Sequence, residues 1–379
     1  MEQEKDLESV YEIAILGRVT WQLHSLNNEG AVGNVTEPRS VRIIDPKTKK
    51  AVTTDGISGE MLKHIHTEIM WTLTDKNKLC DACKVLNPEK FNFAIKSGKL
   101  SVQNVENALE RALKTCDICD VHGFLLEKPT VSRKSTVEFG WALGIPEVYR
   151  DIHTHARHSI SEIVKVEEEK EPGNWGSDKC SKKGCETKSE ESKLLKVEGK
   201  WYCEEHAPVS KGQMVYHRPT RSGIYAVVSV FQPWRIGLNE ARQECYTYDV
   251  NNANEDRKRR YQIALKAYQI MFARPEGAMT TTRFPHVEDF NGVIVYSTKP
   301  IPVPVISPLK DNYIEEIEKI VSTIGKNPEE GEQKETSKEK ERPIKVLKFE
   351  SISCFVNKMN DLLKKQPYIL DFGKKGENK

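Results

Sequence analysis

Apolar and polar side chains alternate near the start of the chain, and this period of two predicts a half-buried strand. The apolar members occupy odd positions, namely Ile13, Ile15, Val19, Trp21 and Leu23. Beyond them the sequence becomes rich in Ser, Asn and Gly, which tolerate turn conformations and leave backbone amides free to donate. We therefore expect a strand that leads into an amide-rich loop ending near Asn34.

Apolar residues recur every three or four positions over residues 58–73 and 256–273, which is the spacing of amphipathic helices. Ser58 is a suitable N-cap for the first of them. Shorter patterns predict helices at 102–114 and 353–365, a hairpin of 41–44 with 51–53, and strands at 121–126, 223–231 and 292–297.

The main elements run strand, helix, strand, long insertion, strand, helix, strand. This β-α-β-β-α-β order is that of the ferredoxin-like unit, whose sheet is also the RNA-recognition-motif platform. We expect an α+β fold with a palm of this kind and large insertions. The expected divisions are a palm of 1–75, 121–150 and 213–320, a cysteine-bearing insertion at 76–120, a second insertion at 151–212, an acidic linker at 327–342 and a C-terminal segment at 343–379.

Charge and composition narrow the class of protein. The 379 residues include 58 basic and 56 acidic ones, so a nucleic-acid surface requires local segregation of charge. The acids cluster in residues 166–172 and 327–341. No run of 18 apolar residues and no secretory signal layout is present, so we expect a cytoplasmic protein without a membrane span. In that compartment, cysteines indicate metal sites or reduced thiols rather than disulfides.

Two CxxC pairs, Cys80–Cys83 and Cys116–Cys119, lie 32 residues apart. Each pair can direct two thiolates at one ion, and two pairs complete a tetrahedral site. We predict structural Zn²⁺ here, with unliganded thiols as the alternative and His122 as a possible replacement ligand. A redox role is disfavoured because two pairs would be redundant.

A second group consists of Cys180, Cys185, Cys203 and His206. Its surroundings are rich in Lys, Ser and Glu and have too few apolar residues to fold unaided, so a second structural Zn²⁺ would supply the missing stability. Trp201 and Tyr202 are placed to cover one side. The alternative is a disordered insertion with spare thiols. We interpret Cys245 and Cys354 as ordinary core or half-buried residues.

Residues 151–159 contain His153, His155 and His158, a spacing similar to the ligand run of binuclear metallohydrolases. The aspartate that such a site needs is replaced by Arg157, a permanent cation. A metal-dependent hydrolase is therefore the weaker hypothesis. His155 and Arg157 could instead contact an RNA backbone, or the segment could be an exposed loop without a role.

Basic and hydroxyl-bearing segments are the other candidate sites, because guanidinium groups, hydroxyls and amides suit phosphates. The local pattern also leaves two alternatives to phosphate binding open. Residues 24–34 could be a loop that only connects two elements, and Arg283 could pair with Glu288 or Asp289 in a polar turn. The residues expected to contact RNA are Arg18, His24, Asn27, Asn28, Arg39, Arg133, Lys134, His155, Arg157, Arg218, Arg221, Arg274, Thr280, Thr281, Thr282 and Arg283.

Several of these segments occur in an order that resembles a known family. The segment from Gly17 to Asn34, with His24-Ser-Leu-Asn-Asn-Glu-Gly, is similar to the opening of the DevR-type CRISPR-associated autoregulators. The likeness continues through His122-Gly-Phe-Leu, Arg221-Ser-Gly and Arg274-Pro-Glu-Gly-Ala-Met. This family is a branch of the Cas-seven backbone proteins of type I Cascade complexes.

The resemblance implies a non-catalytic subunit that polymerises helically along CRISPR RNA (crRNA), contacts other Cascade subunits and holds the guide for pairing with target DNA. It implies palm contacts from Arg18, Asn27, Asn28, Arg39, Arg274 and the threonines before Arg283, and a thumb at 150–220. Besides the backbone subunit and the metal-dependent hydrolase, a transcriptional regulator is the remaining hypothesis, and the sequence has no helix-turn-helix pattern to support it.

Overall fold

The computed structural model describes residues 7–33, 35–96, 105–128, 130–146, 148–158, 166–208, 213–242, 246–277, 280–324 and 342–372. The chain has mixed α and β structure with several sheets. It divides into two compact units. The first consists of Met1–Gly30, Pro38–Asp151 and Pro219–Lys379, and the second of Ala31–Glu37 and Ile152–Arg218.

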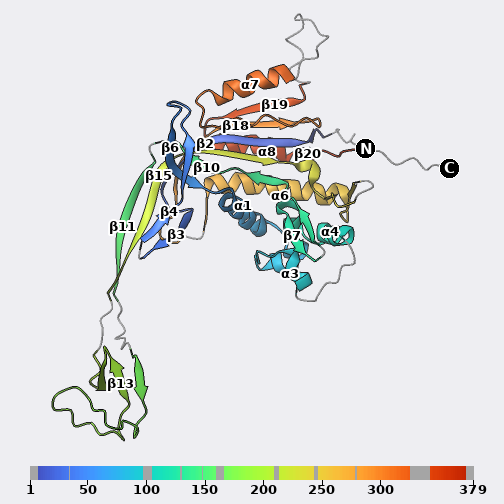
Figure 1. The fold of residues 1–379 in the computed structure, drawn as a ribbon. Coiled ribbons are helices and arrows are strands. Elements are labelled where there is room, and N and C mark those ends of the chain that lie inside the picture. The colour runs from blue at the N-terminus through green and yellow to red at the C-terminus, as the bar shows by residue number, and fades with distance from the viewer. Residues whose placement is uncertain are drawn as a thin grey trace, which may run out of the picture. The chain divides into compact units, whose positions relative to one another are not determined.

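The first unit is built on an antiparallel sheet with the strand order β19-β18-β2-β15-β10-β6-β5, and β9 also pairs with β15 (Figure 1). These strands are β2 (Glu12–His24), β5 (Ser40–Ile44), β6 (Ala51–Ile57), β9 (Val137–Phe139), β10 (Ala142–Gly144), β15 (Gln213–Phe231), β18 (His286–Ser297) and β19 (Ile344–Phe349). The expected opening strand, the 41–53 hairpin and the strands at 223–231 and 292–297 are confirmed.

One face of the sheet packs against helices α1 (Gly59–Leu73), α6 (Ala253–Ala273) and α8 (Ile352–Leu363). Ile13, Ile15, Val19 and Trp21 of β2 point into this core, together with Tyr261 of α6 and Phe355 of α8, whereas Leu23, which the pattern also placed there, is exposed. Ser58 caps α1, because its side chain accepts a hydrogen bond from the Met61 amide. All three helices follow the expected spacing, so these predictions are confirmed.

Helix α7 (Tyr313–Ile324) covers part of the opposite face. Ile317 and Val321 pack there against Ala14 and Leu16, the even-numbered residues of β2. Our sequence analysis did not predict this helix. Both faces of β2 are therefore buried near its start, and its continuous apolar run reflects that.

The cysteine-bearing insertion forms a separate hydrophobic cluster within the first unit, centred on residues such as Leu109, Leu113 and Ile118. Its elements are η1 (Lys76–Lys78), α2 (Asp81–Lys84), α3 (Phe91–Lys96), α4 (Val105–Thr115), α5 (Asp117–His122), β7 (Phe124–Glu127) and β8 (Thr130–Arg133). The predicted helix at 102–114 corresponds to α4, whose first expected residues lie outside the described ones.

The predicted strand at 121–126 is partly wrong. Residues 121 and 122 end helix α5, and strand β7 pairs with β8 in a sheet of its own, whereas β9 and β10 lie beside β15. Gly123 explains the break, because its φ of 66° suits glycine. A Cβ atom there would also lie 2.2 Å from the Arg133 carbonyl oxygen.

The C-terminal residues complete the core of the first unit. Strand β19 extends the main sheet, α8 packs on α6, and β20 (Gln366–Pro367) pairs with β1 (Ser9–Val10). The expected order at 343–372 is thus confirmed, whereas most of the acidic tract at 327–342 lies outside the described residues. The remaining elements are η2 (Pro233–Arg235), β16 (Leu238–Asn239) and β17 (Thr247–Tyr248).

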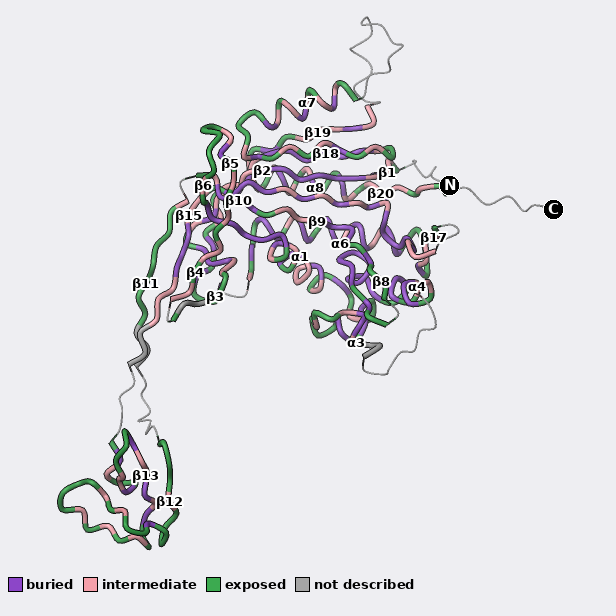
Figure 2. Tube along the Cα trace, in the orientation of Figure 1, coloured by how far each residue is buried: buried purple, intermediate pink, exposed green. Residues whose placement is uncertain are grey.

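The second unit contains a small antiparallel sheet of β12 (Glu168–Lys170), β13 (Leu194–Val197) and β14 (Lys200–Cys203). Strand β13 has buried residues whereas β12 is mostly exposed (Figure 2). Val35 of β4 (Val35–Pro38) pairs with His217, and β4 pairs with β3 (Asn28–Val32). Strand β11 (Tyr149–His158) pairs with β15. Among the described residues, no helix combines the length and apolar character that a membrane span requires.

Candidate metal centres and nucleic-acid interface

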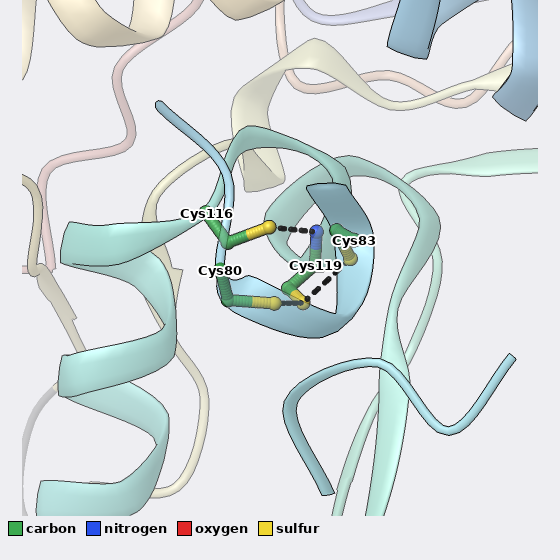
Figure 3. A group of neighbouring side chains, drawn as sticks. All are labelled: Cys80, Cys83, Cys116 and Cys119. Atoms are coloured by element: carbon green, nitrogen blue, oxygen red, sulfur yellow. Dashed lines mark hydrogen bonds between the residues drawn. The ribbon is translucent and has the colours of Figure 1, made fainter. Parts of the chain in front are cut away.

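The four cysteines of the first group converge on one point (Figure 3). All are buried, and their sulfur atoms lie within 4.8 Å of one another. Cys119 Sγ is 3.8 Å from Cys80 Sγ and 3.6 Å from Cys83 Sγ. Zn–S bonds of about 2.3 Å in a tetrahedron place sulfur atoms about 3.8 Å apart. The expected convergence of the two CxxC pairs is confirmed, and the spacing suits a tetrahedral metal ion.

Helix starts position these thiols. Cys80 and Cys116 are the N-cap residues of α2 and α5, and each helix brings its second cysteine back toward the first. His122, at the end of α5, turns elsewhere and contacts His66 Nδ1 at 3.0 Å. The group is therefore made of four cysteines, and the alternative in which His122 replaces one of them is wrong.

The second group also gathers, within the second unit. The ligand atoms of Cys180, Cys185, Cys203 and His206 lie within 4.8 Å of one another. His206 Nδ1 is 3.0 Å from Cys203 Sγ, which is 3.7 Å from Cys185 Sγ. Trp175 and Leu194 are buried against these cysteines; Trp201 packs on them as predicted, whereas Tyr202 is not part of this hydrophobic cluster. Three cysteines and one histidine form a structural zinc donor set.

Helix α5 also bears two buried carboxylates that bind arginines. Asp120 lies 2.7 Å from the Arg133 guanidinium and 2.8 Å from that of Arg260, and Asp117 lies 2.7 Å from Arg260. Glu240 completes the pairing of Arg133 at 3.0 Å. Because the Arg133 side chain is fully enclosed, we leave it out of the RNA interface proposed below. Its contacts instead hold the cysteine-bearing insertion against the rest of the unit.

The loop after β2 brings several predicted RNA contacts together. Ser25 Oγ accepts hydrogen bonds from Arg283 at 3.2 Å and from Asn28 at 3.1 Å. The Asn27 side chain accepts from the Ser58 amide at 2.7 Å, and its carbonyl accepts from the Arg39 amide at 3.4 Å. The loop 24–28 thus joins the start of α1, the start of β5 and the segment before β18.

A buried polar cluster supports this loop from within. His24 Nε2 lies 2.8 Å from the Tyr225 hydroxyl, which donates to Asp55 at 3.1 Å, and Asp55 pairs with Arg221 at 2.9 Å. Burial and the nearby Arg221 charge lower the pKa of His24 well below its usual value. Burial raises the pKa of Asp55 against the opposing effect of Arg221. His24 and Arg221 are therefore supports beneath the loop rather than exposed contacts, and our sequence analysis missed Asp55 and Tyr225.

Residues 274–277 and 280–283 approach the same loop, through Gly277 and Arg283. A Cβ atom at Gly277 would fall 3.7 Å from Leu26, which shows how closely the backbones approach. Arg274 is exposed, pairs with Glu276 at 3.1 Å and lies over the Phe284 ring. Thr280 is buried and bonded to the Gly277 carbonyl, whereas Thr281 and Thr282 are exposed.

Two residues predicted to contact RNA, Arg18 and Lys134, interact with other parts of the first unit. Arg18 donates to the Pro308 carbonyl at 2.8 Å and pairs with Asp311 at 3.0 Å. Lys134 is exposed and pairs with Glu138 at 2.6 Å. These contacts do not connect either residue to the loop 24–28.

In the second unit, His155 stacks on Tyr216 with ring centroids 5.4 Å apart, and Arg218 lies over the same ring. His153 and His155 are exposed on β11, whereas the side chains of Arg157 and His158 lie outside the described ones. Among the described residues, the clusters of metal-ligand type are the two cysteine groups, and neither includes these histidines. The described geometry therefore offers no direct support for the metallohydrolase ligand run.

Comparison with known proteins adds a family match. Residues 15–174 and 200–318 match the family model described as "CRISPR-associated negative auto-regulator DevR/Csa2". The chain is 24% identical over 324 residues to "CRISPR-associated protein Cas7/Cst2/DevR" of Methanocaldococcus jannaschii, covering 83% of this chain and 89% of that protein.

Solved structures show weaker similarity. A chain of a "CRISPR RNA-guided surveillance complex, pre-nicking" has a TM-score of 0.38 and 9% identity, covering 85% of this chain and 89% of its own. Csc2 of Thermofilum pendens has a TM-score of 0.35 and 11% identity, covering 94% and 86%. At such TM-scores these structures support no assignment, whereas the family model spans most of the chain.

Proposed function

The chain belongs to the CRISPR-associated DevR/Csa2 family, and from this premise we propose that it is a crRNA-binding backbone subunit of a CRISPR surveillance complex. Copies of the chain would assemble along the crRNA beside other Cascade subunits and hold the guide for pairing with target DNA. The observation that carries the proposal is the gathering of Asn27, Asn28 and Arg39 around one loop at the end of β2, which the buried Arg283 supports from within.

The sheet of the first unit would be the palm. Its strand order β18-β2-β15 followed by β9 and β10, with α1 and α6 on one face, is the arrangement expected of an RNA-recognition-motif platform. The second unit would be the thumb, with the stacked His155 and Tyr216 and the nearby Arg218 as RNA contacts.

The chemistry of the loop suits a strand of any sequence. Guanidinium groups, side-chain amides and hydroxyls bind phosphate and sugar, and a guide-holding protein must leave base edges free for pairing. Thr281, Thr282 and Arg274 extend this surface, because they are exposed on the segment that lies against the loop. Binding by these groups requires no catalytic residue.

Both cysteine groups would hold structural Zn²⁺. Each supplies four donors and leaves no position for a substrate, which distinguishes them from catalytic zinc sites. In the second unit, whose hydrophobic cluster is small, the ion would contribute folding free energy directly.

Replacing Arg39 or Arg274 with alanine tests the interface. Each variant should bind RNA about tenfold more weakly, because one charge-assisted contact to the backbone is lost. The loss should be nearly equal for two RNAs of unrelated sequence, and the salt dependence of binding should flatten. Fluorescence anisotropy with labelled RNA at several salt concentrations measures both effects.

Lys348→Ala is the matched control, since Lys348 is an exposed cation on β19 that pairs with Glu318 of α7, away from the loop. It should bind RNA like the unaltered protein. A loss confined to one RNA sequence, or an equal loss in the control, would contradict the proposed interface.

A further inference from the structure

A cavity of about 470 Å³ lies within the first unit, between α1, the start of α3 and the β7–β8 hairpin. Helix α3 and strand β7 contact each other near α1 (Figure 1). Lysines, other polar side chains and one aromatic ring share the lining, in which Lys63, Lys90, Asn92, Phe124, Glu127 and Ser132 matter here. The RNA interface and both cysteine groups use other residues.

Lys63 of α1 is the first sign of a ligand. Its side chain is half-buried, and among the described residues its ammonium group has neither a hydrogen-bond nor an ion-pair partner. Burial and the neighbouring Lys90 charge lower the pKa of Lys63 to about 8. The group is still mostly protonated at pH 7, so a cation is held in the cavity wall without a counter-ion.

Lys90 adds a second positive charge, which has no ion-pair partner among the residues that the structure describes. Its ammonium donates to the carbonyl oxygens of His122 at 3.2 Å and Gly123 at 2.6 Å. The backbone of Lys90 has a φ of 50°, an unfavourable value for a residue with a side chain. The chain therefore accepts strain where it places this ammonium beside Lys63.

Two carboxylates, those of Glu89 and Glu127, also line the cavity. The acids that oppose the lowering of the Lys63 pKa are Glu138 and Glu60, and they do not offset burial. Glu127 contributes to the lining but contacts Asn92 at 3.5 Å. The cavity thus has a cationic part formed by the two lysines, and two carboxylates that can accept hydrogen bonds from hydroxyl or amino groups. The Phe124 ring offers a flat apolar wall.

We propose that this cavity binds a small phosphate monoester, with Lys63 and Lys90 at the phosphate and Phe124 against the remainder of the molecule. Two neighbouring ammonium groups suit a dianionic phosphate, and a flat apolar wall suits a ring such as a nucleobase. A free mononucleotide and the phosphorylated end of an RNA strand share this chemistry.

Isothermal titration with AMP tests the proposal, and adenosine is the matched ligand without phosphate. AMP should bind saturably, and adenosine at least tenfold more weakly. Lys63→Met should weaken AMP binding at least tenfold, whereas Lys84→Met, which alters an exposed lysine paired with Asp81 on α2, should not. Absence of AMP binding, equal affinity for adenosine, or unchanged binding by Lys63→Met would overturn the proposal.

A second measurement needs no variant. Acetylation of Lys63 by acetic anhydride, followed by peptide mass spectrometry, should be suppressed by AMP and not by adenosine. Equal labelling with and without AMP would refute the site even if Lys63→Met failed to fold.

Competition then distinguishes the two sources of phosphate. If a short 5′-phosphorylated RNA displaces AMP and its dephosphorylated form does not, the ligand is an RNA end; if neither displaces AMP, it is a free nucleotide. Arg39→Ala should keep its affinity for AMP, so loss of the RNA interface and loss of this cavity give separate results.

Discussion

Buried histidines set the residue-scale behaviour of this protein. His66 of α1 is fully buried and lies against the Tyr268 ring; its Nε2 donates to the Ala264 carbonyl at 3.0 Å, and its Nδ1 lies 3.0 Å from His122 Nε2. Burial lowers the pKa of His66 to about 3. Its neighbour His64 is exposed on the same helix and pairs with Glu68. One turn of helix thus presents one histidine to the core and another to solvent.

The His66 pKa predicts a loss of stability in acid. The folded pKa lies below the unfolded value of about 6.5, so the unfolded chain takes up the proton first as pH falls. Stability from this residue is complete above pH 6.5 and declines toward pH 3, by about 2 kcal/mol at pH 5. Denaturant unfolding of His66→Gln should therefore show a smaller drop in stability between pH 7 and pH 5 than the unaltered protein.

Comparing His66→Gln with His64→Gln separates the effect of His66 from the release of metal ions at low pH, because metal release would affect both variants and the unaltered protein alike. His64→Gln, a change on the exposed side of the same helix, should leave a larger drop in stability between pH 7 and pH 5 than His66→Gln does. If His66→Gln and the unaltered protein lose stability equally between pH 7 and pH 5, His66 is not the group responsible.

Individual arginines show where sequence reasoning at this scale stops. A basic residue beside hydroxyls has the same local pattern whether it meets RNA or a buried carboxylate. Arg221 pairs with Asp55, which lies 166 positions away, and Arg133 pairs with Asp120 and Glu240. These partners are set by the sheet register and by helix packing, so no local pattern could reveal them. The cysteine ligands were predictable because their spacing is itself the geometric requirement.

At the scale of elements, a strong hydrophobic periodicity was sufficient to predict a strand or helix from the sequence. Strand β2 and helices α1 and α6 follow their patterns closely. Helix α7 was also readable, because Tyr313, Ile317 and Val321 are spaced four apart and form its buried face. The prediction of a strand at 121–126 was partly wrong, because an apolar run fits a short strand and the end of a buried helix equally well. Gly123 separates the end of α5 from the start of β7 within this segment.

Helix α5 joins the metal centre to the fold, which leads to a prediction about metal loss. The same helix supplies two cysteine ligands and the carboxylates of Asp117 and Asp120. Cys116→Ser should lower the metal content from about two ions per chain to about one and lower the melting temperature by at least about 5 °C. Elemental analysis and calorimetry measure these two quantities.

Cys203→Ser should also remove one ion but leave the melting of the first unit near its original temperature, because its ligands all belong to the second unit. Cys354→Ser is the control, since Cys354 is a half-buried thiol outside both groups. Full metal content in Cys116→Ser, or loss of an ion in Cys354→Ser, would refute the assignment of the ligands.

For the whole molecule, charge balance makes RNA binding a local property. With 58 basic and 56 acidic residues, the protein has little net attraction for a polyanion. Affinity must come from the few cations near the loop 24–28, some of which already have acidic neighbours, as Arg39 does in Glu29. Each subunit on its own should therefore bind RNA weakly, and contacts between neighbouring copies would supply the rest of the free energy.

The number of copies in an assembly should depend on RNA length. In the proposed backbone, each copy binds one stretch of RNA and one neighbour, and a head-to-tail contact that does not close extends without a fixed end. Native mass spectrometry should compare complexes on one RNA with complexes on an RNA twice as long. The number of copies should double when the RNA length doubles. Arg39→Ala should reduce occupancy at a given protein concentration without changing the RNA length bound per copy. A constant number of copies on every RNA would indicate a closed assembly, and the chain would then bind RNA without forming a backbone along it.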